Sequence, residues 1–392
     1  MPTPVVIVTY YNVLGTGGME THVRRLAKGL SSLGHTGRVI TPADPALGAG
    51  APAKIGNFDL VVVGPPTEKW FPLSRTARIP AMSVRYWLRN FGVTLAAVEA
   101  LRGLRARVLY VPGPVNLPST AALNLVPFWV PLRWIRGTRV VLGARGAASH
   151  WYERRVVARL FALEESAQIR FADIVTAVDH YYAEVLFPAK HRQKYRVITN
   201  GVDTTRFSPR GNSRDGTVTF VGRLTPDRGI DVFLAAVEKL RGADRRFRVV
   251  GDGPLRAWLL ERVRAKSLPV EWSGSVPHAE MPAVYNTSYL VVNPSTVEGI
   301  GNITLEAMAC GRCVIRAASR YGEFAIQDGI NGMLFPGGNA EALARKIDDA
   351  QRNPDVVERL GREARATVMR HFTEADEAKA YSELFESLAC LA

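Results

Sequence analysis

Cysteine is scarce in this sequence, and the scarcity narrows the classes of protein to which the chain can belong. Only Cys310, Cys313 and Cys390 occur among 392 residues. Three thiols cannot build the disulfide framework of a secreted scaffold, and no second pair of ligands completes a zinc site with Cys310 and Cys313. We therefore expect a reducing, cytoplasmic environment and no structural metal.

Targeting and membrane-spanning patterns are also missing. The first residues, Met1-Pro2-Thr3-Pro4, lack the basic stretch with which a secretory signal peptide begins. One long uncharged run, 108–132, lies between Arg107 and Arg133, but prolines interrupt it repeatedly. Because prolines break helices, we expect a strand, a loop and a core helix there instead of a membrane span.

Acidic residues are few in the first half of the chain. Residues 1–200 hold 25 lysines and arginines against 11 aspartates and glutamates, whereas the remainder holds 25 of each sign. The net charge of +14 therefore belongs entirely to the first half. A basic half attracts anions such as a charged or membrane-linked acceptor, a membrane surface or nucleic acid. Solvated arginines on helix faces are the alternative explanation, and we do not expect nucleic acid as a partner.

The order of hydrophobic segments predicts an α/β protein with two domains. A chain of 392 residues exceeds what a single core usually supports. Short apolar runs alternate with longer amphipathic stretches, which is typical of parallel sheets covered by helices. The predicted strands of the first half are 5–9, 38–41, 59–63, 81–84, 107–111, 139–144 and 173–177, and helices are predicted at 19–33, 356–369 and 374–391.

A polar stretch marks the predicted domain boundary. Asn200-Gly201 is a turn signal, and residues 208–216 are rich in glycine, serine and asparagine. A strand predicted at 217–221 then restarts the alternating pattern. We therefore predict a basic N-terminal domain at 1–198, a C-terminal domain at 199–373 and a final helix at 374–392.

Two glutamates that flank a glycine-spaced turn are the most informative feature of the chain. Glu298 precedes the turn, and Glu306 lies about one turn into the helix predicted to follow. A strand–loop–helix passage offers backbone N–H groups and the positive end of a helix dipole, where a phosphate is stabilised. An acid beside a phosphate is expected to point at hydroxyl groups, so the pair suggests a nucleotide-sugar site. Acids near a helix N-terminus are favoured in any case, and that explanation stays open.

Two arginines follow the strand predicted at 217–221. Arg223 precedes and Arg228 follows a turn at the carboxyl end of that strand, where open α/β sheets bind their ligands. Both guanidinium groups can converge on a diphosphate. The alternative is that Arg228 pairs on the surface with Asp227 or Asp231.

Glycines also follow the first predicted strand. Gly15, Gly17 and Gly18 allow the backbone to approach a ligand closely. Their spacing is not Gly-x-Gly-x-x-Gly, which disfavours a dinucleotide-dependent oxidoreductase.

Together these motifs resemble glycosyltransferase family 4, a family of retaining enzymes with the GT-B architecture. The second half of the chain matches closely and the first half loosely. The resemblance implies an α/β fold of two Rossmann-like domains that face each other across a cleft. The N-terminal domain would bind the acceptor and the C-terminal domain the donor, and the final helix would cross back to the first domain. The matching motifs are Gly17-Gly18-Met19-Glu20, Leu33-Gly34-His35, Asn200-Gly201-Val202-Asp203, Gly222-Arg223-Leu224, Arg228-Gly229, Gly251-Asp252-Gly253-Pro254, the block from Glu298 to Gly311, and Asp328-Gly329-Ile330-Asn331-Gly332.

The resemblance also implies roles for individual residues. Arg223 and Arg228 would neutralise the diphosphate of the donor. Glu306 would hold the ribose hydroxyl groups, and Glu298 a hydroxyl group of the transferred sugar. No cofactor and no metal ion would be needed, and the chain contains no Asp-x-Asp motif. The other implied donor-binding positions are Gly222, Gly301, Asn302, Ile303 and Thr304, with Gly17 and Gly18 closing from the first domain.

Arg145 departs from the family pattern. Many relatives carry a histidine near the end of the strand predicted at 139–144, where this chain has Ala144-Arg145-Gly146. An arginine is permanently charged and cannot act as a general base. We expect Arg145 to contact a phosphate, a sugar hydroxyl or an anionic acceptor. His150 is the alternative candidate, although a histidine beside Trp151 more often serves packing.

We therefore expect a retaining, metal-independent transferase that moves a hexose from a UDP- or GDP-linked sugar to a hydroxyl group. The acceptor would be a glycan, a glycolipid or a lipid-linked saccharide. A nucleotide-sugar epimerase on the same scaffold is the alternative. Residues 128–136 combine apolar and cationic groups, so they form either a segment for peripheral membrane contact or a core helix before the next strand.

Overall fold

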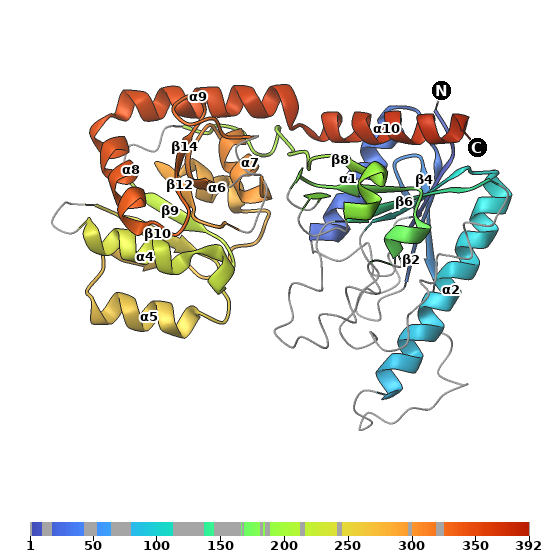
Figure 1. Ribbon diagram of the computed structural model, residues 1–392, viewed down its shortest axis with the longest axis horizontal. Helices are drawn as coiled ribbons and strands as arrows, with labels where there is room; N and C mark the ends of the chain where they lie inside the picture. The colour runs from blue at the N-terminus through green and yellow to red at the C-terminus, as the bar shows by residue number, and fades with distance from the viewer. Residues whose placement is uncertain are drawn as a thin grey trace. The chain divides into compact units, whose positions relative to one another are not determined.

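The computed structural model describes residues 2–9, 18–42, 53–63, 80–112, 137–144, 166, 168–180, 183–184, 189–211, 216–240, 245–296, 300–318 and 325–391. The chain divides into two compact units. One is formed by Met1–Thr199 together with Ala375–Ala392, and the other by Asn200–Glu374. Each unit is built on one largely parallel sheet that carries helices (Figure 1).

The first unit contains a sheet in the order β3-β4-β2-β1-β5-β6-β7-β8. Its strand neighbours run parallel, except that β3 and β4 form a short antiparallel pair at one edge. The strands are β1 (Val5–Val8), β2 (Gly37–Pro42), β3 (Lys54–Ile55), β4 (Phe58–Val63), β5 (Val108–Pro112), β6 (Arg139–Ala144), β7 (Ile174–Ala177) and β8 (Tyr195–Val197), and the helices are α1 (Gly18–Ser32), α2 (Pro80–Leu104), the 3-10 helix η5 (Ala189–Lys194) and α10 (Glu374–Cys390).

Strand β1 shows why this sheet needs helices on both faces. All four of its side chains are buried. Successive side chains of a strand point to opposite faces, so Val5 and Ile7 pack with α1 and α10, whereas Val6 and Val8 pack with α2. A continuous apolar run is what a strand covered on both faces requires.

One strand predicted from the sequence is wrong. Residues 81–84 lie in the first turns of α2, which begins at Pro80 and continues for 25 residues. A short apolar run has no periodicity that distinguishes a strand from a buried helix, and proline at the first helical position favours the helix. The other six strands predicted in the first half are present, each with its ends shifted by at most one residue.

Helix α10 returns to the first unit and is held there by a chain of buried polar contacts. Glu377 accepts a hydrogen bond from Arg25 at 2.6 Å, and its carboxylate lies 3.1 Å from Nδ1 of His22. Nε2 of His22 lies 3.2 Å from the hydroxyl of Tyr110, which in turn lies 3.1 Å from the hydroxyl of Tyr381. The contacts join α1, β5 and α10, so they fix the last helix to the first sheet.

The second unit holds a sheet of six parallel strands in the order β11-β10-β9-β12-β13-β14. Counted along the chain this is the order 3-2-1-4-5-6, which is that of dinucleotide-binding α/β folds. The direction of the strand order therefore reverses between β9 and β12. The elements are β9 (Val218–Val221), η6 (Pro226–Arg228), α4 (Ile230–Lys239), β10 (Phe247–Val250), α5 (Arg256–Ala265), β11 (Val270–Trp272), α6 (Met281–Asn286), β12 (Leu290–Asn293), α7 (Asn302–Ala309), β13 (Cys313–Ala318), β14 (Met333–Pro336), α8 (Ala340–Arg352) and α9 (Pro354–His371).

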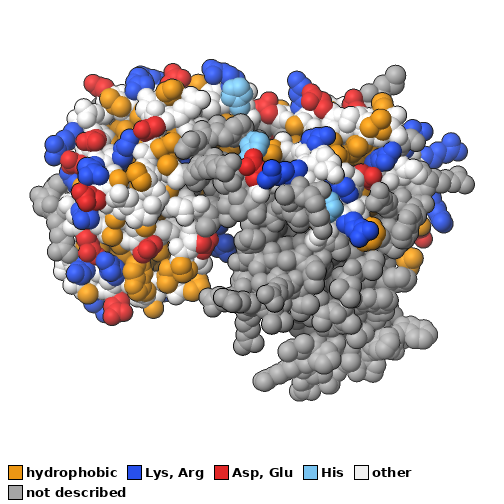
Figure 2. All heavy atoms as spheres, in the orientation of Figure 1, with side chains coloured by type: hydrophobic (Ala, Val, Ile, Leu, Met, Phe, Trp, Pro, Cys, Tyr) orange, Lys and Arg blue, Asp and Glu red, His pale blue; other side chains and the backbone are white. Residues whose placement is uncertain are grey.

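Each face of the second sheet has its own apolar core. Helices α4, α5 and α8 contribute to the core around Phe233, and α6 and α7 contribute to the core around Met308 (Figure 1). Helix α9 contributes to both, through Leu360 and Val368 respectively. On the face of this unit that Figure 2 shows, acidic and basic side chains are interspersed, in keeping with the balanced charge of the second half of the sequence.

The predictions about membranes fall mainly on parts of the chain that are not described. Residues 113–136, which include the segment 128–136, lie outside the described residues. Among the helices in the described ranges, none is both long enough and apolar enough to cross a membrane.

Replacing Glu377 with alanine should loosen the attachment of α10. The Glu377 side chain is 2% exposed, and breaking a buried ion pair typically costs about 3–5 kcal/mol. We expect the amide hydrogens of α10 to exchange with solvent at least about tenfold faster than in the wild type. Glu383→Ala changes an exposed glutamate of the same helix and is the control. Unchanged protection of α10 in Glu377→Ala would show that this contact does not hold the helix.

Candidate functional site

The two charged motifs of the second unit converge where its strand order reverses. Strands β9 and β12 are neighbours, with Leu290 paired to Val218 and Val292 paired to Phe220. The chain leaves both strands at the same edge of the sheet, and open α/β sheets bind ligands there. Residues 222–228, which follow β9, and residues 301–306, which follow β12, therefore form one site. We call these two segments the switch-point site.

Two contacts join the loop after β9 to the loop after β12. The hydroxyl of Ser295 donates to the carbonyl oxygen of Asp227 at 3.1 Å. Gly229 has a φ of +70°, and a Cβ atom at this position would lie 2.8 Å from the carbonyl oxygen of Pro294. Only glycine tolerates both the backbone conformation and the close approach. The two loops are thus one packed surface.

The end of β10 supports the loop that carries the arginines. A Cβ atom on Gly251 would lie 1.8 Å from the carbonyl oxygen of Gly222, so glycine is required for the two backbones to meet. The N–H of Leu224 donates to the carbonyl of Asp252 at 3.0 Å, and the N–H of Leu255 donates to the carbonyl of Leu224 at 3.0 Å. The close approach to Gly222 explains Gly251 in the motif Gly251-Asp252-Gly253-Pro254.

Helix α7 presents its N-terminus to the switch-point site. Gly301 is the N-cap residue and has a φ of +70°. Because glycine has no side chain, it cannot cap the first N–H groups of the helix with a side-chain hydrogen bond. No acidic residue lies in the first turn. Thr304 is buried, and its hydroxyl accepts a hydrogen bond from the side-chain amide of Asn293 at 3.1 Å. The start of α7 therefore has the free N–H groups and the dipole that suit an anion.

The two arginines differ in their surroundings. Arg223 is exposed, whereas the side chain of Arg228 is only 17% exposed. Nε of Arg228 lies 3.3 Å from a carboxylate oxygen of Asp227, so the pairing considered from the sequence is present. Because the Asp227 side chain is 42% exposed, the pair is worth only about 0–1 kcal/mol. An anion at the site can therefore compete for the Arg228 guanidinium.

Glu306 is a buried carboxylate held by two donors. Its Oε1 lies 2.8 Å from Nε2 of His278, and its Oε2 accepts from the hydroxyl of Tyr285 at 2.9 Å. Burial, and after it the charge of Glu306, raises the pKa of Tyr285 well above its usual value, so the phenol remains a neutral donor. A carboxylate has about four acceptor positions, so Glu306 retains capacity for further donors.

The structure brings some of the predicted residues together and leaves others undescribed. Gly222, Arg223 and Arg228 lie on one side of the switch-point site, and Gly301, Asn302, Ile303, Thr304 and Glu306 lie on the other. Gly18 is the first residue of α1, which follows β1. Glu298, Arg145, Gly17 and the alternative candidate His150 lie outside the described residues, and their predicted roles stay predictions.

Sequence reasoning missed His278 and Tyr285. His278 follows β11 at the same edge of the sheet as the arginines, and a predicted order for the second sheet would have indicated this position. Tyr285 lies within α6 and is fully buried, so its sequence context resembles that of any core aromatic residue. No local signal distinguishes it.

Two family models match this chain. One, described as Glycosyltransferase Family 4, matches residues 16–206, and the other, described as Glycosyl transferases group 1, matches residues 215–353. Alpha-D-kanosaminyltransferase from Streptomyces kanamyceticus is 26% identical over 274 residues, which cover 67% of each chain. For seven further curated relatives the matched segment spans only 41–56% of their own length.

Solved structures extend the likeness to the whole chain. Sucrose-phosphate synthase from Thermosynechococcus elongatus matches with a TM-score of 0.73 at 19% identity, covering 100% of both chains. HepE from Anabaena in complex with UDP matches with a TM-score of 0.69 at 17% identity, covering 99% of this chain and 100% of HepE. At such identities the likeness concerns the fold, and the predicted GT-B fold class is confirmed.

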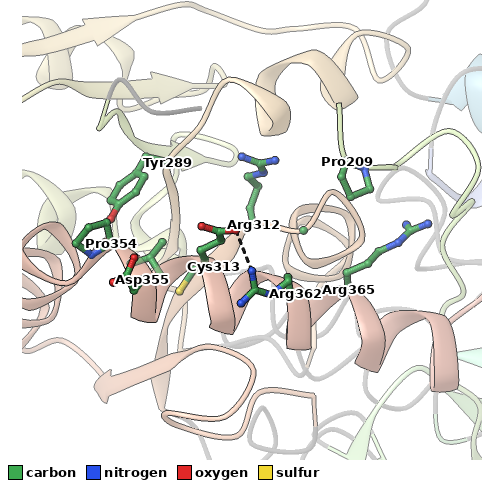
Figure 3. Close-up of a pocket in the computed structure, with 11 residues that line it drawn as sticks. Pro209, Tyr289, Arg312, Cys313, Pro354, Asp355, Arg362 and Arg365 are labelled. Carbon is green, nitrogen blue, oxygen red and sulfur yellow. Dashed lines mark hydrogen bonds and ion pairs between the residues drawn. The ribbon is translucent and has the colours of Figure 1, made fainter. Parts of the chain in front are cut away.

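A cavity of about 640 Å³ lies elsewhere in the second unit, against α9 (Figure 3). Tyr289 and Cys313, at the amino ends of β12 and β13, line it, so it lies at the sheet edge opposite to the switch-point site. Its arginines already have partners. Arg365 donates to three backbone carbonyls, and Arg362 pairs with Glu358 at 2.9 Å. None of the predicted site residues lines this cavity.

Cys310 and Cys313 should be inert toward thiol reagents in the folded protein. Burial raises the pKa of each thiol to about 12, so at pH 8 only about one in ten thousand is a thiolate. Cys390 is exposed. We expect a chromogenic disulfide to modify one thiol per native chain and all three thiols after denaturation. Rapid modification of two or three thiols in the native protein would contradict the burial of the pair.

Proposed function

The chain belongs to glycosyltransferase family 4, and from this premise we propose that it is a retaining hexosyltransferase that uses a nucleoside diphosphate sugar. The acceptor in this proposal is a hydroxyl group of a glycan, a glycolipid or a lipid-linked saccharide. The observation that carries the proposal is that the loop with Arg223 and Arg228 and the start of α7 follow neighbouring parallel strands at one edge of the sheet. A nucleoside diphosphate sugar combines the anion that these groups suit with the hydroxyl groups that Glu306 suits.

The charges of the switch-point site favour a diphosphate. Two guanidinium groups and the positive end of a helix dipole lie at the ends of neighbouring strands. Glu306 lies one turn deeper in α7, where its carboxylate would accept from the ribose hydroxyl groups. Solved complexes of HepE, a protein with the same fold, contain UDP and UDP-glucose, which supports a donor of this class.

The proposed reaction exchanges one bond of the anomeric carbon for another. The bond from this carbon to the diphosphate oxygen breaks, and a bond to the acceptor oxygen forms on the same face of the sugar. The acceptor proton passes to an oxygen of the leaving diphosphate, and the products are a glycoside and a nucleoside diphosphate. Negative charge grows on the diphosphate in the transition state, and Arg223, Arg228 and the first N–H groups of α7 would stabilise it.

A thermal-shift panel with UDP, GDP, ADP, TDP and their sugars tests the donor. The correct nucleotide raises the melting temperature by mass action. Product analysis with the donor alone then distinguishes a transferase, which leaves the configuration of the sugar ring unchanged, from an epimerase, which inverts a centre. The reported relatives give the epimerase alternative no support. A protein that none of these nucleotides stabilises would refute the proposal.

Arg223→Ala and Arg228→Ala should each lower kcat/KM for the donor roughly 10- to 100-fold. Each variant removes a charge-assisted hydrogen bond to the leaving diphosphate, which is worth about 1.5–3 kcal/mol. Arg264→Ala changes an exposed arginine in the last turn of α5 and is the matched control, with kcat/KM expected within about threefold of the wild type. If both site variants have the same kcat/KM for the donor as Arg264→Ala, the assignment of the two arginines is wrong.

Removal of divalent cations should not stop the transfer reaction. The guanidinium groups and the helix end supply the positive charge that a cation supplies in other enzymes, so we expect the initial rate in EDTA to stay within about twofold of the untreated rate. The rate is followed with radiolabelled donor. Loss of activity in EDTA that magnesium or manganese restores would show that the site requires a metal ion.

A further inference from the structure

Glu306 is fixed in orientation by groups from two elements other than its own helix. His278 belongs to the loop after β11, and Tyr285 belongs to α6. A carboxylate only accepts hydrogen bonds, so Nε2 of His278 carries a proton and donates to Oε1. The Tyr285 hydroxyl donates to Oε2. With one donor on each oxygen, rotation of the carboxylate breaks at least one of the two hydrogen bonds.

His278 is itself anchored, but it does not fill the core. Arg206 donates to the carbonyl oxygen of His278 at 2.7 Å, and the ring of Phe207 lies 5.4 Å from the imidazole ring. The His278 side chain is nevertheless 51% exposed, whereas that of Glu306 is 10% exposed. Replacement of a half-exposed side chain leaves no buried cavity, so the hydrogen bond to Glu306 can be removed without unpacking the unit.

We infer that His278 and Tyr285 are positioning residues that aim the remaining acceptor directions of Glu306 at the two neighbouring hydroxyl groups of the donor ribose. The inference rests on the proposed function, because it requires Glu306 to face a nucleoside diphosphate. A carboxylate that is already fixed gains the full hydrogen bond from each hydroxyl group, whereas a carboxylate that rotates freely must first lose orientational freedom, so the second hydroxyl group contributes less to binding. His278 therefore sets how strictly the site selects ribose over 2′-deoxyribose.

Two substitutions of similar polarity separate positioning from general stability. His278→Gln places an amide N–H about where Nε2 lies, so the hydrogen bond to Glu306 can form again. His278→Asn carries the same amide on a shorter side chain and cannot reach Oε1. If His278 had a purely structural role, the two variants would show the same preference for ribose. If His278 positions Glu306, His278→Gln should keep the preference and His278→Asn should lose it.

The experiment is calorimetric titration with UDP and 2′-deoxy-UDP, and with GDP and 2′-deoxy-GDP. Hydrogen bonds to charged groups imply that the wild type prefers the ribonucleotide of the accepted base by roughly tenfold or more. We expect the preference to fall below about threefold in His278→Ala, His278→Asn and Tyr285→Phe, and to persist in His278→Gln. In the transfer assay the KM for the donor should rise while kcat stays within about twofold. His371→Ala, an exposed histidine at the end of α9, is the control.

The outcomes distinguish this inference from the proposal on which it rests. If neither UDP nor GDP binds, the proposed function is refuted, and the inference that rests on it is refuted as well. If Glu306→Ala keeps the preference for ribose, the assignment of Glu306 is wrong and His278 has nothing to position. If Glu306→Ala abolishes the preference but His278→Ala retains it, the proposed function stands and the positioning role of His278 is refuted.

Discussion

The candidate site depends on the contact between the loop that follows β9 and the loop that follows β12. The hydrogen bond from Ser295 to Asp227 and the close approach of Gly229 to Pro294 hold the two loops together. Parallel pairing of the strands brings the arginines and the start of α7 to one sheet edge, and these contacts then make a single surface of them. A side chain at Gly229 would separate the loops, which explains the glycine directly after Arg228.

The same arrangement explains how the carboxylate of Glu306 can lie near a candidate anion site. The first turn of α7 contains no acidic residue, so an anion at this position would meet the N–H groups and the helix dipole without an opposing negative charge. Glu306 comes one turn later and directs both carboxylate oxygens to donors, namely His278 and Tyr285. Its negative charge is thereby satisfied by hydrogen bonds, away from the helix end.

Local patterns were enough to predict most strands of the first half and the position of the two arginines after a strand, because each depends on residues close in sequence. The buried run at Val5–Val8 and the motif around Arg223 and Arg228 are of this kind. Contacts between distant segments were not predictable. His278 meets Glu306 across 28 positions, and Glu377 meets Arg25 across 352. Residues 81–84 show the limit of local reasoning, since an apolar run of four residues fits a strand and a helix equally well.

A crystal structure with bound nucleoside diphosphate tests the central claim most directly. We expect both phosphates to lie within hydrogen-bond distance of the guanidinium groups of Arg223 and Arg228 and of the first N–H groups of α7, with the ribose hydroxyl groups on Glu306. A nucleotide whose phosphates lay at another edge of the sheet, or in the cavity against α9, would contradict the assignment of the site.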